Sequence, residues 1–224
     1  MTRPSNPPLL SALRADAAEL AKVKGGGTRG VSDVLDVLTI PGFWAVALWR
    51  VGNALHERGL RPLSRLAYVA DMVLFGADLP AGAVVGPGLV MPHPVGVAMA
   101  SDVVLGSRCR VMRGVGIGGS GKPGRSGHPV IGDDVWLLDR SAVFGPVRIG
   151  DNVVVGASAV VSEDVPAGML VLLARTATEL RVRPRTDLDP VGEAPDREAP
   201  SPDVAAEQKH DTDARAFDAV DRPS

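Results

Sequence analysis

The chain has 224 residues, enough for one or two domains with a sizeable core. Hydrophobic residues make up 45% of it but aromatic residues only 4%, so the core must be built from Val, Leu, Ile and Ala. The formal net charge is −2, and the lack of a basic surplus argues against nucleic acid as a partner.

The cysteine count and the hydropathy pattern exclude further classes. The single cysteine, Cys109, excludes a disulfide scaffold and a zinc site of the CxxC type, and we expect no bound metal. No run of about 18 apolar residues occurs, so no membrane span is expected. Residues 1–8 lack the basic-then-apolar pattern of a secretion signal. These features predict a soluble cytoplasmic protein.

Three helices are predicted in the N-terminal third of the chain. The first covers residues 9–24 and stops at the glycine run 25–27. The second begins after residues 40–42, carries apolar residues at three- and four-residue spacing, and ends at Gly59. The third covers residues 63–75. Because the polar faces lack the Lys/Arg excess of membrane-surface helices, we expect the apolar stripes to pack against the rest of the protein.

From residue 83 onward the sequence follows a six-residue period. Aliphatic residues recur at every sixth position, and after each of the later ones a second small or branched residue follows at the fourth position. The first register comprises Val85, Met91, Leu105, Val111, Ile117, Ile131, Leu137, Val143, Ile149, Val155 and Val161. The second register comprises Val135, Ser141, Val147, Val153, Ala159 and Val165.

A six-residue step suits neither a helix nor a long alternating strand. It predicts a solenoid of short strands in which each flat side of a turn points one aliphatic side chain inward. Glycines such as Gly132, Gly150 and Gly156 directly follow inward residues, and we expect them to allow tight corners. Cys109 lies four residues after Leu105 and is expected to be a small core residue rather than a nucleophile.

Two interruptions break the six-residue period. The first, at residues 92–94, adds two residues and contains His93. The second, at residues 118–129, is rich in glycine and contains His128. Loops that leave a regular scaffold often carry function, so these two histidines are the leading candidates for catalysis or binding.

The C-terminal segment differs from the rest in charge. Residues 184–224 contain eleven Asp/Glu, five Lys/Arg and six prolines. Such a segment cannot bury enough apolar area to offset its ordering entropy. We expect a disordered, solvated tail; a partner-docking segment is the less favoured alternative.

Four short motifs add a likeness to a known family. They are Phe75-Gly76-Ala77-Asp78, Met91-Pro92-His93-Pro94-Val95-Gly96, Gly118-Gly119-Ser120-Gly121-Lys122 and Gly127-His128-Pro129. Together with the repeat, over residues 34–165, they resemble the hexapeptide-repeat acyltransferases, and within these the serine O-acetyltransferases. The resemblance implies a left-handed parallel β-helix that assembles as a homotrimer or a dimer of trimers, with active sites between neighbouring subunits.

The resemblance also implies roles for single residues. His93 corresponds to the catalytic base, and Asp78 to the aspartate that orients it. His128 corresponds to a histidine that lines the substrate site, and Arg125 is a candidate to bind substrate beside it. The co-substrate is acetyl-CoA and the acceptor a small molecule with a hydroxyl group. The expected cofactor-binding residues are Gly118, Gly119, Ser120, Gly121, Lys122 and Ala157.

The composition, the periodicity and the resemblance together divide the chain into four parts. They are a flexible or helical N-terminus (1–30), a helical domain (31–75), the β-helix catalytic domain (76–175) and a disordered acidic, Pro-rich tail (176–224). The family's terminal isoleucine, which docks into O-acetylserine sulfhydrylase, has no counterpart here, so that complex is not expected.

Some positions depart from the family pattern. Pro92 stands where the family has an aspartate, and Gly127 stands where it has an arginine. These two family residues grip an amino-acid acceptor, so their loss removes orienting, charge-assisted hydrogen bonds. Arg125 lies two residues away and is placed to substitute. The family's small Ile-Gly-Ala-Gly coil reads Leu-Leu-Asp-Arg at residues 137–140, which alters one wall of the expected acyl-CoA groove.

Three functions are therefore weighed. The leading hypothesis is O-acetylation of L-serine for cysteine synthesis. The alternative is the same chemistry on another hydroxyl, such as that of a sugar, a polysaccharide or a specialised metabolite, and the lost charged residues favour it. The least favoured hypothesis is a β-helix without activity that serves as an assembly subunit.

Overall fold

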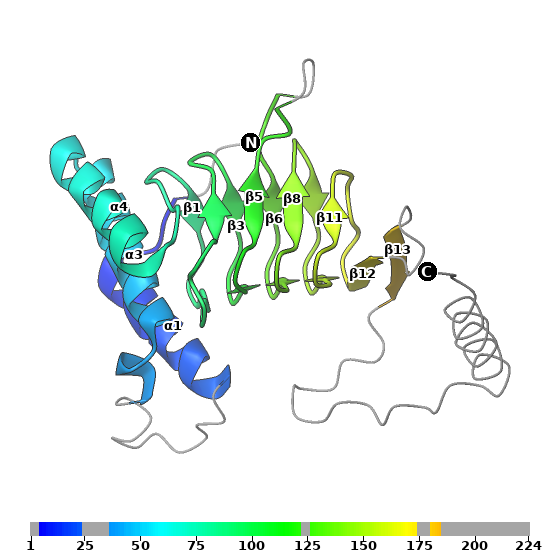
Figure 1. The fold of residues 1–224 in the computed structure, drawn as a ribbon, viewed down its shortest axis with the longest axis horizontal. Helices are drawn as coiled ribbons and strands as arrows, with labels where there is room; N and C mark the ends of the chain where they lie inside the picture. Colours follow the sequence, from blue (N-terminus) through cyan, green and yellow to red (C-terminus); the bar gives the residue numbers. More distant parts are fainter. Residues whose placement is uncertain (1–4, 24–35, 122–125, 174–179, 185–224) are drawn as a thin grey trace, which may run out of the picture. The chain divides into compact units, whose positions relative to one another are not determined.

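The computed structural model describes residues 5–23, 36–121, 126–173 and 180–184, the last by their backbone. The long helices that the structure describes precede the strands, in the blue to cyan part of the ribbon (Figure 1): α1 (Leu9–Val23), α3 (Pro41–Glu57) and α4 (Arg61–Phe75). These bounds confirm the three helices predicted from the sequence. Within the described residues, no helix is long and apolar enough to span a bilayer.

Helices α3 and α4 form a hairpin whose ends follow from local sequence. Each has a proline in its first turn, where a missing N–H costs no helical hydrogen bond. Helix α4 ends at Gly76, which has φ +66° and donates its N–H to the carbonyl of Met72. At the crossing of the two helices, a Cβ on Gly52 would lie 3.2 Å from the Cβ of Ala67, so a small residue there permits close packing.

A buried ion pair joins the helices to the first coil. The Arg50 Nε on α3 lies 2.8 Å from the Asp16 Oδ2 on α1, and both side chains are nearly inaccessible. Arg50 also donates to the carbonyls of Val85 and Gly86, and Asp16 accepts the N–H of Leu89. The charges are therefore satisfied on both sides, as a buried pair requires.

From Val84 the chain winds as a parallel β-helix, drawn in green to yellow in Figure 1. Successive strands pass from one sheet to the next, so every turn has three sides. The first sheet has the order β1-β3-β6-β9, the second β4-β7-β10-β12-β13 and the third β2-β5-β8-β11. The strands are β1 (Val84–Val85), β2 (Ala98–Met99), β3 (Val104–Leu105), β4 (Arg110–Val111), β5 (Gly116–Gly118), β6 (Val130–Ile131), β7 (Trp136–Leu137), β8 (Ala142–Phe144), β9 (Arg148–Ile149), β10 (Val154–Val155), β11 (Val160–Val161), β12 (Met169–Leu173) and β13 (Leu180–Pro184).

The last pairing departs from the predicted disordered segment. Strand β13 lies within residues 176–224 and pairs antiparallel to β12, whereas the other pairings between named strands are parallel. The final coil leaves the edge of β12 with unpaired N–H and C=O groups, and an added strand satisfies them. The rest of the predicted tail lies outside the described residues.

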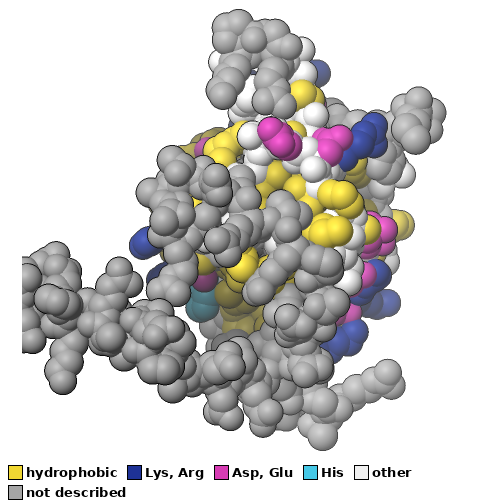
Figure 2. Space-filling model, turned by 90° about the vertical axis from the view of Figure 1, so that its right-hand side faces the viewer, with side chains coloured by type: hydrophobic (Ala, Val, Ile, Leu, Met, Phe, Trp, Pro, Cys, Tyr) yellow, Lys and Arg dark blue, Asp and Glu magenta, His cyan; other side chains and the backbone are white. Residues whose placement is uncertain are grey.

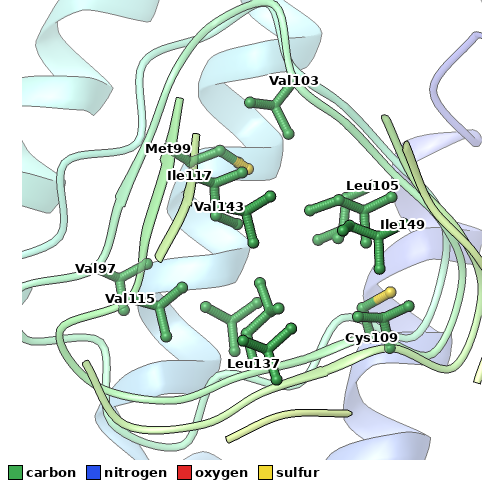
Figure 3. Close-up of a cluster of buried hydrophobic side chains, with 14 of the residues drawn as sticks. Val97, Met99, Val103, Leu105, Cys109, Val115, Ile117, Leu137, Val143 and Ile149 are labelled. Atoms are coloured by element: carbon green, nitrogen blue, oxygen red, sulfur yellow. The ribbon is translucent and has the colours of Figure 1, made fainter. Parts of the chain in front are cut away.

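The core is the aliphatic interior that the six-residue period predicts. Every residue of both registers is at most 6% exposed. Figure 3 shows Met99, Ile117 and Val143 pointing inward from the third sheet, while Leu105 and Ile149 point inward from the first. Cys109 is fully buried in this core, and burial raises the pKa of its thiol to about 12, which confirms a packing role.

The glycines that follow inward residues serve a different purpose from the one predicted. Gly132 and Gly150 do not adopt a positive φ. A Cβ on Gly150 would overlap the backbone nitrogen of Ala167 on the next coil. The left-handed corners fall two residues later, at Asp134 and Asn152, with φ of 55° and 56°. Gly132 and Gly150 are therefore needed for close approach of stacked coils, while the left-handed corners are made by polar residues such as Asp134 and by other glycines such as Gly114.

The two predicted interruptions occur where the period breaks. Between Met91 and Val97, successive inward residues are six apart instead of four. The second interruption leaves the coil between β5 and β6, where Figure 1 shows the chain projecting beyond its neighbours.

A view onto the side of β11 to β13 shows hydrophobic side chains gathered at the centre and charged ones of both signs along one edge (Figure 2).

Candidate active site

His93 lies on a corner of the coil, between the second and third sheets. Prolines on either side, Pro92 and Pro94, restrict the backbone at this point. The corner is anchored because the Gly114 N–H donates to the carbonyl of Val95. The His93 side chain is exposed, so its imidazole is open to a substrate.

Strand register places charged residues in a column beside His93. Val90 pairs with Arg110, Arg110 with Trp136, and Trp136 with Val154. Three residues further on, the same register aligns Arg113, Asp139 and Ala157 on three successive coils. The two added residues of the first interruption put Val95, rather than His93, level with Arg113, since the Gly114 N–H donates to the carbonyl of Val95. We call Arg113, Asp139 and Ala157, with His93 on the corner of the preceding coil, the His93 column.

A pocket of about 940 Å³ opens beside the His93 column. Its lining includes His93, Arg113 and Asp139, together with Leu74 and Phe75 from the end of α4. The other lining residues are Pro41, Gly76, Pro92, Pro94, Val95 and Met112. The walls are thus mostly apolar, as in many small-molecule sites, and the titratable groups come from the column.

Asp78 is held by a neighbour that the sequence did not indicate. Its backbone pairs with the third sheet, since the Asp78 N–H donates to the carbonyl of Val97. Its Oδ1 accepts a hydrogen bond from the Tyr68 hydroxyl at 2.9 Å. The pKa of Tyr68 is raised mainly by desolvation, and further by the hydrogen bond to Asp78 and by the negative charge of Asp78. In the described part of one chain, no hydrogen bond or ion pair joins Asp78 to His93.

His128 lies at the far end of the second interruption. Its Nδ1 is 4.0 Å from the Asp102 Oδ2, and its side chain is 31% exposed. A Cβ on Gly119 would lie 3.5 Å from the His128 Nε2, so the two ends of this segment approach each other. Gly121 adopts φ +64°, a conformation that favours glycine.

Most of the predicted site residues that the structure describes fall into two groups within one chain. His93 and Ala157 belong to the His93 column, which precedes the strands of the third sheet. Gly118 ends β5, and Gly119, Ser120, Gly121 and His128 lie beyond that end of the strands. Asp78 belongs to neither group and pairs with Ala98 at the start of the third sheet. Lys122 and Arg125 lie outside the described residues.

Arg113, Asp139 and Tyr68 were not singled out as site residues from the sequence. The first two are found only in the folded chain, where they line the same pocket as His93. Nothing in the local sequence marks Tyr68, because its contact with Asp78 depends on how α4 packs against the first coil.

Comparison with known proteins places this arrangement in a family. Residues 128–163 match the family of bacterial transferase hexapeptide repeats (six repeats). The chain is 33% identical over 136 residues to the serine acetyltransferase of Synechococcus elongatus, which covers 61% of this chain and 56% of the relative. It is 32% identical over 142 residues to the serine acetyltransferase of Helicobacter pylori strain J99, which covers 63% of this chain and 83% of the relative.

The fold has a solved counterpart as well. The crystal structure of Neisseria gonorrhoeae serine acetyltransferase in complex with serine matches with a TM-score of 0.66 and 29% identity, over 76% of this chain and 68% of that one. The chain spans just over half the length of the Synechococcus elongatus relative and most of the Helicobacter pylori one. With its hexapeptide repeat, its three-sided coil and these relatives, the chain belongs to the serine acetyltransferase family of hexapeptide-repeat transferases.

Proposed function

We propose that the protein is an acetyl-CoA-dependent O-acetyltransferase that converts L-serine to O-acetyl-L-serine, a step of cysteine synthesis, in the cytoplasm. One observation carries the proposal: in a chain of this family, the exposed imidazole of His93 lines the pocket of about 940 Å³ at the coil corner. A histidine suits the reaction because its reference pKa lies near working pH.

The proposed reaction transfers the acetyl group directly. A nitrogen of the His93 imidazole accepts the proton of the acceptor hydroxyl as that oxygen attacks the thioester carbonyl. The tetrahedral intermediate then collapses, the carbon–sulfur bond breaks, and the imidazolium returns the proton to the thiolate of CoA. The products are the acetyl ester and the free CoA thiol. A positioned base of this kind contributes typically about 10²–10⁴-fold in rate.

Other residues are assigned to binding and orientation. Asp78 is proposed to orient the imidazole of His93, and Tyr68 to hold that carboxylate in place. Backbone N–H groups of Gly118 to Gly121 are proposed to bind acetyl-CoA, with Ser120 and Lys122 beside them. Ala157 extends the groove because its small, exposed side chain leaves room at the next coil.

The proposed assembly is a trimer of left-handed coils, alone or paired as a dimer of trimers. His93 and His128 lie beyond opposite ends of the strands of the third sheet, so one chain does not bring both to a single substrate. The outward residues of that sheet include Ala98, Gly116 and Ala142, which allow another subunit to approach closely. A neighbour's second histidine, with Arg125, is then proposed to complete the acceptor site.

A second candidate is acetylation of another hydroxyl, such as that of a sugar. Pro92 lines the pocket beside His93 and offers no charge to an amino-acid acceptor. The charged residues of this wall are Arg113 and Asp139 instead. A different polar pattern beside the base favours a different acceptor.

Release of thiol from acetyl-CoA tests the proposal. Wild-type protein is given L-serine, other amino alcohols and sugars in parallel, and His93→Ala is assayed with each active acceptor. We expect turnover with L-serine and a loss of about 10²-fold or more in the variant, because the base is removed. His56→Ala, an exposed histidine on α3, serves as the matched control and should keep full activity.

The outcomes separate the two candidates. Turnover of another hydroxyl without turnover of L-serine selects the alternative acceptor. Full activity in His93→Ala, with an unchanged oligomer, refutes the assignment of the base.

A further inference from the structure

We propose that Arg113 is the anion-binding residue of the His93 pocket, so that a substrate bound there carries a carboxylate next to the reacting group. This inference rests on the proposed acyl transfer at His93 and adds the chemical class of the substrate. The carboxylate belongs either to the acceptor or to the acyl group of the donor, and the test below distinguishes these sources.

The position of Arg113 in the coil comes first. It lies on the coil directly after that of His93 and directly before that of Asp139. The backbone confirms the stacking, because the Arg140 N–H donates to the carbonyl of Arg113 and the Ser158 N–H donates to that of Asp139. Neighbouring strands lie about 4.8 Å apart, so the long side chain of Arg113 can reach a molecule in contact with His93.

The hydrogen bonds of Arg113 leave part of its guanidinium for a ligand. Its Nε donates to the Asp139 Oδ1 at 3.0 Å. Within the described chain, its terminal nitrogens have no hydrogen-bond acceptor. A contact through Nε alone restrains the side chain, and the Nη groups remain able to bind the two oxygens of a planar carboxylate.

The surroundings favour an anion as the ligand. Arg113 and Asp139 are the charged residues of the pocket lining, and the remaining wall apart from His93 is formed by Pro, Leu, Phe, Val, Met and Gly. Apolar walls strengthen a charge-assisted hydrogen bond. The side chain of Arg113 is 64% exposed, so the solvent screens part of this gain. The expected contribution is therefore moderate.

The experiment uses matched pairs of substrates with the full-length enzyme. One pair is L-serine and L-serinamide, each with acetyl-CoA, which differ in the carboxylate of the acceptor. The other is succinyl-CoA and acetyl-CoA with one acceptor, which differ in a carboxylate on the acyl group. The variants are Arg113→Gln, Arg113→Lys and Asp139→Asn. The control is Arg108→Gln, because Arg108 forms the same kind of ion pair with Asp134 on another corner of the coil.

We expect Arg113→Gln to raise KM for the carboxylated member of one pair by about tenfold while changing its uncharged partner by less than about twofold. Arg113→Lys should give a KM between those of the wild type and Arg113→Gln, since it keeps the charge but loses the paired Nη groups. Asp139→Asn should raise the same KM by a smaller factor. Arg108→Gln should leave KM for both members of each pair unchanged. The affected pair identifies the source of the carboxylate.

Equal changes for both members of both pairs, or no change, would overturn the inference. The affinities of the enzyme for L-serine and succinyl-CoA, measured by calorimetry, test the anion site without requiring turnover. Binding that depends on Arg113 in a protein without turnover would support the anion site while refuting acyl transfer at His93. Binding that is unchanged in the Arg113 variants of an enzyme that retains turnover would refute the anion site while supporting acyl transfer.

Discussion

Ser141 is a polar residue in an otherwise apolar stack. It occupies the second inward register and is fully buried, and among the described residues its hydroxyl has no hydrogen-bond partner. Burying a hydroxyl without a partner is unfavourable, whereas its removal leaves only a small change in volume. The stacked positions above and below it, Val115 and Ala159, show that small and branched side chains both fit at this corner.

We therefore predict that Ser141→Ala raises the free energy of unfolding by about 1 kcal/mol. Urea denaturation at fixed protein concentration measures it. Leu137→Ala, at a fully buried position of the first register, is the control and should lose about 2–5 kcal/mol. A loss of stability in Ser141→Ala would mean that the hydroxyl has a partner in the folded protein.

At the scale of elements, the α3–α4 hairpin contains a buried acid. Asp71 on α4 is fully buried, and neither of its carboxylate oxygens has a hydrogen-bond partner in the part of the chain that the structure describes. Burial raises the pKa of this carboxyl to about 7. An unfolded aspartate titrates near 3.9, so between about pH 4 and pH 7 the folded chain binds the proton that the unfolded chain has lost. Stability falls as the pH rises through this window and is constant above it.

We predict that Asp71→Leu removes this contribution. The thermal midpoint of the wild type should fall between pH 5 and pH 7 by more than that of the variant, and above pH 7 the variant should be the more stable. Asp102→Asn, at an exposed position, is the control and should follow the wild type. Parallel pH profiles for the wild type and Asp71→Leu would contradict the buried, unpaired carboxyl.

Elements differ in how far sequence alone defines them. The six-residue period predicts which residues point inward, because in a coil of short strands each inward position depends on its own strand. The His93 column is not predictable in the same way. His93 and Arg113 are 20 residues apart and Arg113 and Asp139 are 26 apart, since the two interruptions change the length of a turn. The spacing of residues in the sequence therefore does not predict the members of this column without the strand pairing.

At the scale of the whole molecule, the short motifs indicate candidate site residues but not how these are distributed. His93, Asp78 and His128 stay predictions, and one chain holds them in separate surroundings. Asp78 contacts Tyr68 and His128 lies near Asp102, while His93 lines the pocket with Arg113. How subunits meet is a property of surfaces far apart in sequence, which local patterns do not encode. The proposed acetyl transfer therefore depends on a site shared between neighbouring chains.

Subunit complementation tests that shared site most directly. Chains with His93→Ala and chains with His128→Ala are each expected to have greatly reduced acetyl transfer when they assemble alone. When the two are co-expressed, some interfaces combine an intact His93 from one chain with an intact His128 from the other. For random trimers we predict recovery of up to about a quarter of wild-type activity. Mixed trimers, verified by mass spectrometry, that recover no activity would contradict the shared site.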